Sequence, residues 1–83
     1  MKIRVRTAGL LGKYLPPGSA GNAADIDVAD GATPTEVIAQ LGMPTDASYL
    51  VTLNGESLPR AERAHRALAA NDDLAIMPPL KGG

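Results

Sequence analysis

Polar and apolar residues alternate in two stretches of the first third of the chain. Residues 2–6 read KIRVR and residues 25–30 read DIDVAD. A period of two is typical of a strand with one face buried, and β-branched side chains favour strands. We therefore predict two strands here, paired antiparallel. The positions expected to face the core are Ile3, Val5, Ile26 and Val28.

A helix is predicted between residues 33 and 42, where the apolar period changes from two to about 3.6. Thr33 is placed to cap the helix, Pro34 suits the first helical position, and Glu36 completes the Thr-x-x-Glu pattern of a capping box. Gly42 follows the last apolar position and is expected to end the helix. The apolar stripe of this helix consists of Val37, Ile38 and Leu41.

The second half of the chain contains two further strand patterns. Residues 49–56 form an apolar strand that runs into Asn54-Gly55, a strong hairpin signal. Residues 61–70 have good helix formers and few large apolar side chains, so we expect a loop with a helical turn. Residues 71–72 then form a turn, and residues 74–77 form a buried strand that Pro78 ends.

The predicted order is strand, strand, helix, strand, short strand or turn, strand. One short helix is also indicated at residues 10–15, followed by a flexible loop at residues 18–24. A main helix packed on one face of a mixed sheet of four to five strands belongs to the α+β class. Because the first and last strands are both strongly apolar, we expect them side by side and parallel in the centre of the sheet.

The composition excludes several kinds of protein. The net charge is −1, and the 83 residues include two tyrosines, no tryptophan and no phenylalanine. A nucleic-acid binder is expected to have a basic excess and stacking aromatic residues, so we predict no nucleic-acid partner. No apolar run approaches the ~20 residues of a membrane span. We expect a cytoplasmic protein that has no membrane contact.

The chain also has few residues that could carry out catalysis. It has no cysteine, which excludes a disulfide, a thiolate nucleophile and a cysteine-based metal site. His65 is the only histidine; it lies in a polar, alanine-rich stretch, and we interpret it as a solvated side chain. We therefore predict no metal site built on cysteine or histidine.

The chain ends in MPPLKGG, and this tail is the most unusual feature of the sequence. Glycine has no side chain to pack and loses much backbone entropy when ordered. Two terminal glycines therefore add little to a folded domain. We predict a folded domain over residues 1–79 and a flexible tail over residues 80–83.

In element order and tail, the sequence resembles the MoaD/ThiS family of ubiquitin-like (β-grasp) sulfur carrier proteins. The segments that carry the resemblance are VTLNGE (51–56), LAANDDLAIMPP (68–79) and LKGG (80–83), with KYLPPG (13–18) similar to the molybdopterin branch. NGESLPR (54–60) is closer to the thiamine branch.

The chain departs from the family pattern at three positions. Asn71 stands where members usually have glycine, and asparagine tolerates a positive φ better than most residues. Thr7 and Met77 stand where many molybdopterin-branch members have phenylalanine. We therefore expect the apolar patch that such carriers offer to partners to be weaker or differently shaped.

The resemblance implies a function at the last residue. An ATP-dependent enzyme similar to ubiquitin-activating enzymes would adenylate the Gly83 carboxylate. A sulfur donor would then convert it to a thiocarboxylate, for use by a molybdopterin synthase large subunit or a thiazole synthase. ATP would be used by the partner and not held by this chain, which would bind no metal or cofactor and would have no enzymatic activity of its own. The residues expected to contact partners are Met77, Leu80, Lys81, Gly82 and Gly83.

Two alternatives to the carrier function remain open from the sequence. The same adenylate could join Gly83 to lysines of other proteins, as in a ubiquitin-like modifier, or the tail could be inert on a plain binding module.

Arg60, Arg63 and Arg66 are spaced by three, which places them on one side of a helical turn. They form either a solvated face or a docking site for an acidic partner.

Overall fold

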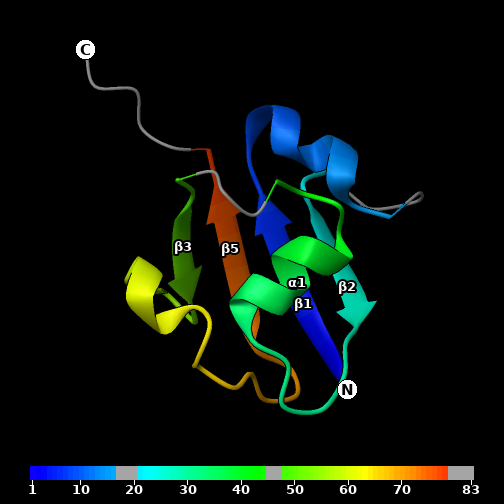
Figure 1. Ribbon diagram of the computed structural model, residues 1–83. Coiled ribbons are helices and arrows are strands. Elements are labelled where there is room, and N and C mark those ends of the chain that lie inside the picture. The colour runs from blue at the N-terminus through cyan, green and yellow to red at the C-terminus, as the bar shows by residue number, and fades with distance from the viewer. Residues whose placement is uncertain (17–20, 45–47, 79–83) are drawn as a thin grey trace.

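The computed structural model describes residues 1–16, 21–44 and 48–78. These residues form one mixed five-stranded sheet with the strand order β2-β1-β5-β3-β4. A single α-helix, α1, crosses one face of the sheet (Figure 1). The elements are β1 (Lys2–Thr7), β2 (Ala23–Asp27), α1 (Pro34–Gln40), β3 (Leu50–Leu53), β4 (Glu56–Ser57), β5 (Asp73–Met77) and the 3₁₀ helices η1 (Gly9–Tyr14) and η2 (Arg60–Glu62).

The predicted pairing of the first and last strands is confirmed. β1 and β5 are parallel neighbours in the middle of the sheet, with Val5 opposite Leu74 and Thr7 opposite Ile76. The other pairings, β1 with β2, β3 with β5 and β3 with β4, are antiparallel. β5 therefore ends at the opposite end of the sheet from the N-terminus (Figure 1).

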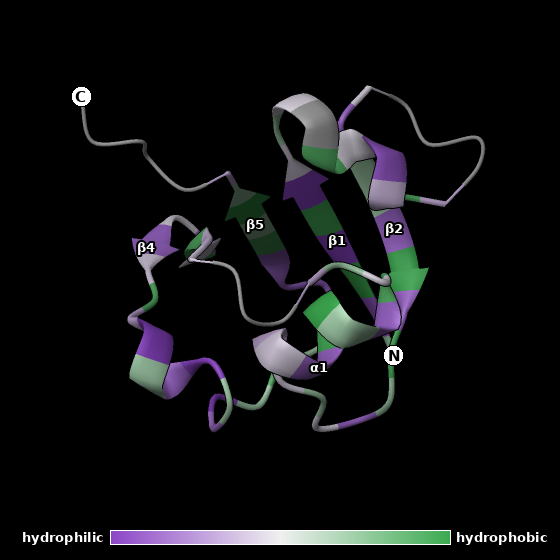
Figure 2. Cartoon of the chain, turned by 45° about the horizontal axis from the view of Figure 1, so that its top comes forward, coloured by the Kyte–Doolittle hydropathy of each residue, from purple (hydrophilic) through white to green (hydrophobic). Residues whose placement is uncertain are grey.

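The core lies between the sheet and α1, and the predicted strand periodicity produces it. In β1 every second side chain is buried, and the intervening side chains are exposed on the face opposite α1. Figure 2 shows this alternation as green and purple bands along the strands. The most deeply buried side chains are Ile3, Val5, Pro34, Val37, Leu74 and Ile76.

α1 begins and ends where the sequence predicts. The Thr33 hydroxyl accepts a hydrogen bond from the Glu36 backbone N–H, and the Glu36 carboxylate accepts one from the Thr33 backbone N–H. The two bonds form a complete capping box. Beyond the C-cap Leu41, Gly42 takes a φ of +81°, which suits a residue without a β-carbon.

The two turns at the start of β5 are tied together by side-chain hydrogen bonds. The Asn54 side-chain amide donates to Asp72 Oδ1 at 3.0 Å and accepts from the Asp73 backbone N–H at 2.9 Å. The second Asp72 oxygen accepts from the Ala69 backbone N–H at 2.8 Å. Asn71, in the same turn, has a φ of +70°, as expected for a residue in the family's glycine position.

Several boundaries differ from the sequence predictions, most clearly those of β2 and of the first short helix. β2 spans Ala23–Asp27 and not residues 25–30, because Ala23 and Ala24 pair with β1 and extend the ladder into the predicted loop. The predicted short helix is a 3₁₀ helix at Gly9–Tyr14. Gly9, at its start, has a φ of +58°, which lies outside the range of both α- and 3₁₀ helices and suits a glycine.

Candidate functional site

The tail follows directly from the central strand β5. Met77 is the last residue of β5, and Pro78 is the last residue that the structure describes. Leu80, Lys81, Gly82 and Gly83 lie outside the described residues, and so does the predicted boundary at residue 79. The assignment of these residues to partner binding therefore stays a prediction.

An apolar patch lies where the tail begins, on the sheet face opposite α1. Leu50 is the one large hydrophobic residue of the described chain that is exposed, with 45% of its surface accessible. It lies opposite the partly buried Met77 in the β3–β5 pairing, and Ala75 of β5 is also partly buried on this face. We call Leu50, Ala75 and Met77 the open-face patch.

Sequence reasoning missed Leu50, although the signal was present. In β3, Val51 and Leu53 are buried, so a period of two places Leu50 on the opposite face. The stretch was interpreted as an apolar strand without separating its two faces. The exposed leucine beside Met77 enlarges the patch that the sequence had suggested would be weak.

Two ion pairs lie on the same face, across β2, β1 and β5. Arg4 Nε lies 3.3 Å from Asp25 Oδ1, joining β1 to β2. Arg6 Nε lies 3.0 Å from both carboxylate oxygens of Asp73, joining β1 to β5. Exposed pairs such as these contribute little stability each. The residues of the open-face patch are uncharged, in contrast to these four side chains.

Thr7 does not contribute to this patch, which corrects the sequence expectation. Its side chain is on the α1 side of the sheet and only 5% of the residue is exposed. Its hydroxyl has no hydrogen-bond partner in the structure. Because β1 continues its alternation to Thr7, this position faces inward, whereas Met77 faces the open side.

The structure brings together two of the three arginines that the sequence grouped. The helical turn η2 covers only Arg60–Glu62. Burial lowers the pKa of Arg63 below its ordinary value, and the positive charge of Arg60 lowers it further. Arg66 lies beyond the end of η2, and its backbone N–H donates to the Glu62 carbonyl at 2.9 Å. His65 is exposed, in agreement with its interpretation as a solvated residue.

The described residues contain neither a candidate metal site nor a candidate membrane span. No three histidine or carboxylate side chains among them are placed to share a metal ion. None of their helices has the length and apolarity that crossing a bilayer requires.

Comparisons with known proteins define the class. The chain is similar to the crystal structure of SAMP1 from Haloferax volcanii, with 26% identity over all of both chains and a TM-score of 0.67. It also has the fold of a chain in the complex of subunits 1 and 2 of molybdopterin-converting factor from Helicobacter pylori, with 18% identity over all of both chains and a TM-score of 0.61. The comparison with curated proteins returned no match.

The fold is therefore the ubiquitin-like β-grasp fold, as the sequence predicted. A scan against protein-family models matches residues 18–83 to the ThiS family. The chain belongs to the ThiS family. This membership supports a sulfur carrier or ubiquitin-like modifier, and proteins of the ThiS and MoaD kind are small carriers rather than enzymes.

Proposed function

We propose that this protein is a sulfur carrier whose Gly83 carboxylate is activated by a partner enzyme and converted to a thiocarboxylate. The carboxylate attacks the α-phosphate of ATP, forming an acyl-adenylate and releasing pyrophosphate. A sulfur donor then displaces AMP and leaves sulfur on the Gly83 carbonyl carbon. The thiocarboxylate donates that sulfur in the biosynthesis of a cofactor of the molybdopterin or thiamine type.

One observation carries the proposal: the match to the ThiS family extends through the last residue of the chain. The match therefore includes both terminal glycines and not only the folded body. An extended segment of residues 80–83 is long enough to reach about 13 Å. Glycine has no side chain to obstruct a narrow channel, so this end suits entry into the active site of another enzyme.

The open-face patch supports a role for protein partners. Leu50 and Met77 lie together at the end of the sheet where the tail begins, so one partner could contact the patch and the tail at once. The Helicobacter pylori relative is described in a complex of two subunits. We propose a corresponding synthase subunit as a partner, in addition to the activating enzyme and sulfur donor.

Intact-mass measurement tests the proposal. We expect the protein, incubated with the activating enzyme of its source organism, ATP and a sulfur donor, to gain the mass difference between sulfur and oxygen. A variant lacking Gly83 is the control and should stay unchanged. An unmodified wild-type chain, with an activating enzyme shown to be active on another carrier, would contradict the proposal.

The likeness to SAMP1 favours a second candidate, a protein modifier joined through Gly83 to lysines of target proteins. A structure of the same kind of protein is described as small archaeal modifier protein 1. This function predicts adducts of higher mass in cells that express the tagged protein and no adducts when Gly83 is deleted. If wild-type cells contain no such adducts, the modifier function is refuted and only the carrier function remains.

A further inference from the structure

The side chains of Arg60 and Arg63 carry positive charge that the described residues do not neutralise. The strand arginines Arg4 and Arg6 each lie beside a carboxylate. No described carboxylate lies within ion-pair distance of Arg60 or Arg63, although the whole chain has a net charge of −1. The pair is therefore a local basic surface on a slightly acidic protein.

Hydrogen bonds hold this pair in place. Arg63 Nε donates to the Leu58 carbonyl at 3.2 Å, and the Arg63 carbonyl accepts from the Thr35 N–H of α1 at 3.2 Å. Arg60 donates to the Ser48 hydroxyl at 3.5 Å. Burial lowers the pKa of Arg63, and the positive charge of Arg60 lowers it further. Two like charges kept together in this way favour an anionic ligand.

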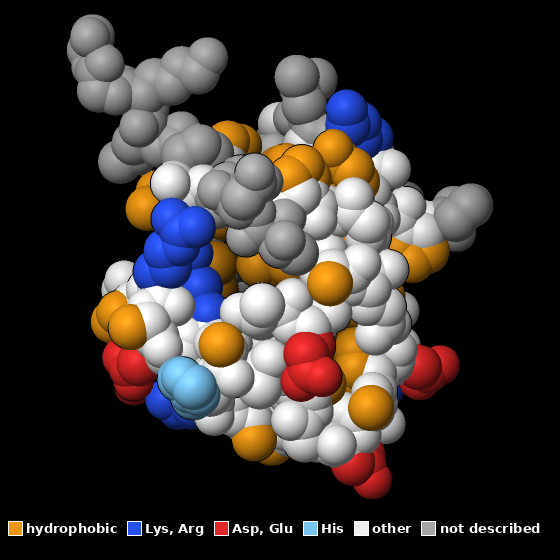
Figure 3. Space-filling model, viewed as in Figure 1, with side chains coloured by type: hydrophobic (Ala, Val, Ile, Leu, Met, Phe, Trp, Pro, Cys, Tyr) orange, Lys and Arg blue, Asp and Glu red, His pale blue; other side chains and the backbone are white. Residues whose placement is uncertain are grey.

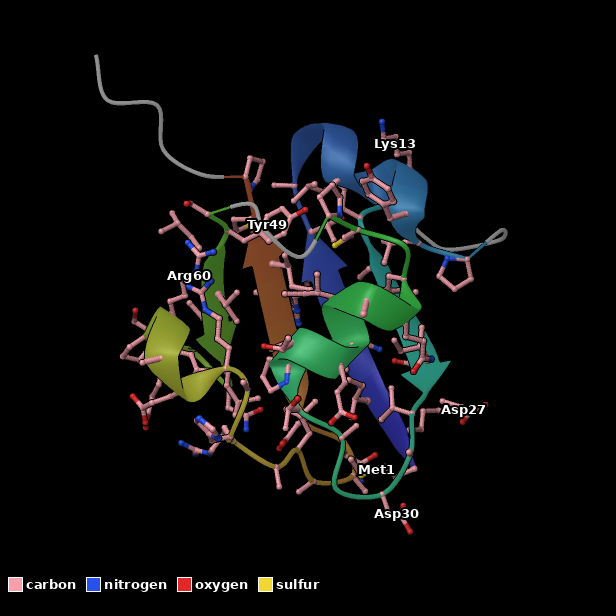
Figure 4. The ribbon with its side chains drawn as sticks, viewed as in Figure 1. Met1, Lys13, Asp27, Asp30, Tyr49 and Arg60 are labelled. Atoms are coloured by element: carbon pink, nitrogen blue, oxygen red, sulfur yellow. The ribbon has the colours of Figure 1, made fainter. Side chains whose placement is uncertain are left out.

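The pair lies toward the end of the sheet where the tail begins. Ser48, which contacts Arg60, is two residues before Leu50, and Leu50 pairs with Met77 at the end of β5. Figure 4 labels Arg60 beside β3, and Figure 3 shows Lys and Arg side chains gathered at the same place. This view looks onto α1, whereas the open-face patch is on the other side of the sheet.

We propose that Arg60 and Arg63 form a docking contact for an acidic surface, rich in Asp and Glu, on the enzyme that activates the tail. The inference rests on the proposed function and assigns a second contact to the same partner. Complementary charge increases the rate of encounter between proteins. The basic pair would orient this chain with its tail toward the active site.

Kinetics of adenylate formation test the docking contact. We expect Arg60→Glu/Arg63→Glu to lower kcat/KM for the carrier about tenfold at low salt, within the range of electrostatic steering. The difference should disappear near 1 M salt, where the Debye length is about 3 Å. Arg66→Glu/Lys2→Glu is the matched control, because it changes net charge equally outside the pair. Equal losses in both variants would overturn the proposal.

Arg60→Glu alone guards against a folding defect, because the hydrogen bond of the Arg60 side chain within the described residues is the long one to Ser48, at 3.5 Å. We expect Arg60→Glu to have the melting temperature of the wild type and to show part of the loss in kcat/KM that the double variant shows. A normal kcat/KM in this folded variant would count against docking, even if the double variant is impaired.

A titration with deca-glutamate separates this inference from the proposed function, because it needs no enzyme. We expect amide NMR shifts at Arg60 and Arg63 in the wild-type chain, and none in the double variant. Inorganic phosphate and ATP are separate arms. Equal shifts with phosphate, or no shifts with deca-glutamate, would refute an acidic protein partner. A wild-type chain that is never adenylated would refute the proposed function, while this titration would still decide the surface.

Discussion

Thr7 shows that a single buried atom can be left without a partner in this small core. Its hydroxyl is buried, and no donor or acceptor of the described residues satisfies it. The Thr7 backbone is well bonded, since its N–H donates to the Asn22 carbonyl at 2.8 Å. The cost therefore belongs to the side chain. Burying an unsatisfied hydroxyl costs about 1–3 kcal/mol.

We expect Thr7→Val to stabilise the domain by about 1 kcal/mol, because valine keeps the shape and removes the unsatisfied oxygen. Urea denaturation followed by circular dichroism measures the change in the free energy of unfolding. Thr7→Ser is the control: it keeps the hydroxyl, loses the methyl group and should destabilise. A Thr7→Val protein less stable than wild type would mean that the hydroxyl is satisfied in solution.

At the scale of elements, α1 depends on its ends because it is only seven residues long. A helix this short is marginal in isolation. Its capping box satisfies backbone donors at the first turn, and Val37 and Ile38 fix it to the sheet. The helix is thus maintained by one cap and a short apolar stripe.

Thr33→Ala should destabilise the domain by about 1 kcal/mol, since it removes the acceptor for the Glu36 backbone N–H. Thermal denaturation gives the measurement. Thr33→Ser retains the acceptor oxygen and is expected to be close to wild type. Equal losses in the two variants would show that the methyl group, and not the cap, is what matters at this position.

The sequence predicted those elements whose signals are local. The capping residues Thr33 and Glu36 and the turn residue Asn54 act within a few positions, and the strand alternation was clear in residues 2–6. The central β1–β5 pairing was also predicted, from the apolar core-facing residues of the first strand and the apolar residues of the last strand. The start of β2 at Ala23 was not, because alanine has no strand preference and pairing with β1 decides it.

The candidate site was less predictable than the fold. Met77 was expected at a partner surface, and the structure adds Leu50 beside it through a pairing between distant segments. Arg60, Arg63 and Arg66 were grouped by their spacing, but the structure shows that the turn η2 ends at Glu62 and does not extend to Arg66. Such groupings depend on tertiary contacts, and the sequence has no local pattern that encodes them.

At the scale of the whole molecule, the two faces of the sheet differ in purpose. One face is covered by α1 and contains the core, whereas the other combines ion pairs with the open-face patch. Exposed apolar residues on a small protein mark sites of interaction when they cluster. The patch and the basic pair are both near the start of the tail, on opposite sides of the sheet.

Leu50→Lys should weaken the complex with the activating enzyme about tenfold, because a charge would enter an apolar contact. Stability should change by less than about 0.5 kcal/mol, since Leu50 is already 45% exposed. Calorimetric titration and thermal denaturation measure the two effects. Ala29→Lys adds the same charge at another exposed position and is the control. Unchanged affinity in Leu50→Lys would remove the patch from this interface.

The parallel pairing of β1 with β5 has a mechanical consequence. The N-terminal end of β1 and the C-terminal end of β5 are at opposite ends of the sheet, so traction on the tail against the N-terminal end shears the two strands lengthwise. All the hydrogen bonds from the Arg4–Asp73 pair to the Thr7–Ile76 pair then resist together and do not open one after another like a zipper. An enzyme that holds the last residues can therefore pull on them without unfolding the domain.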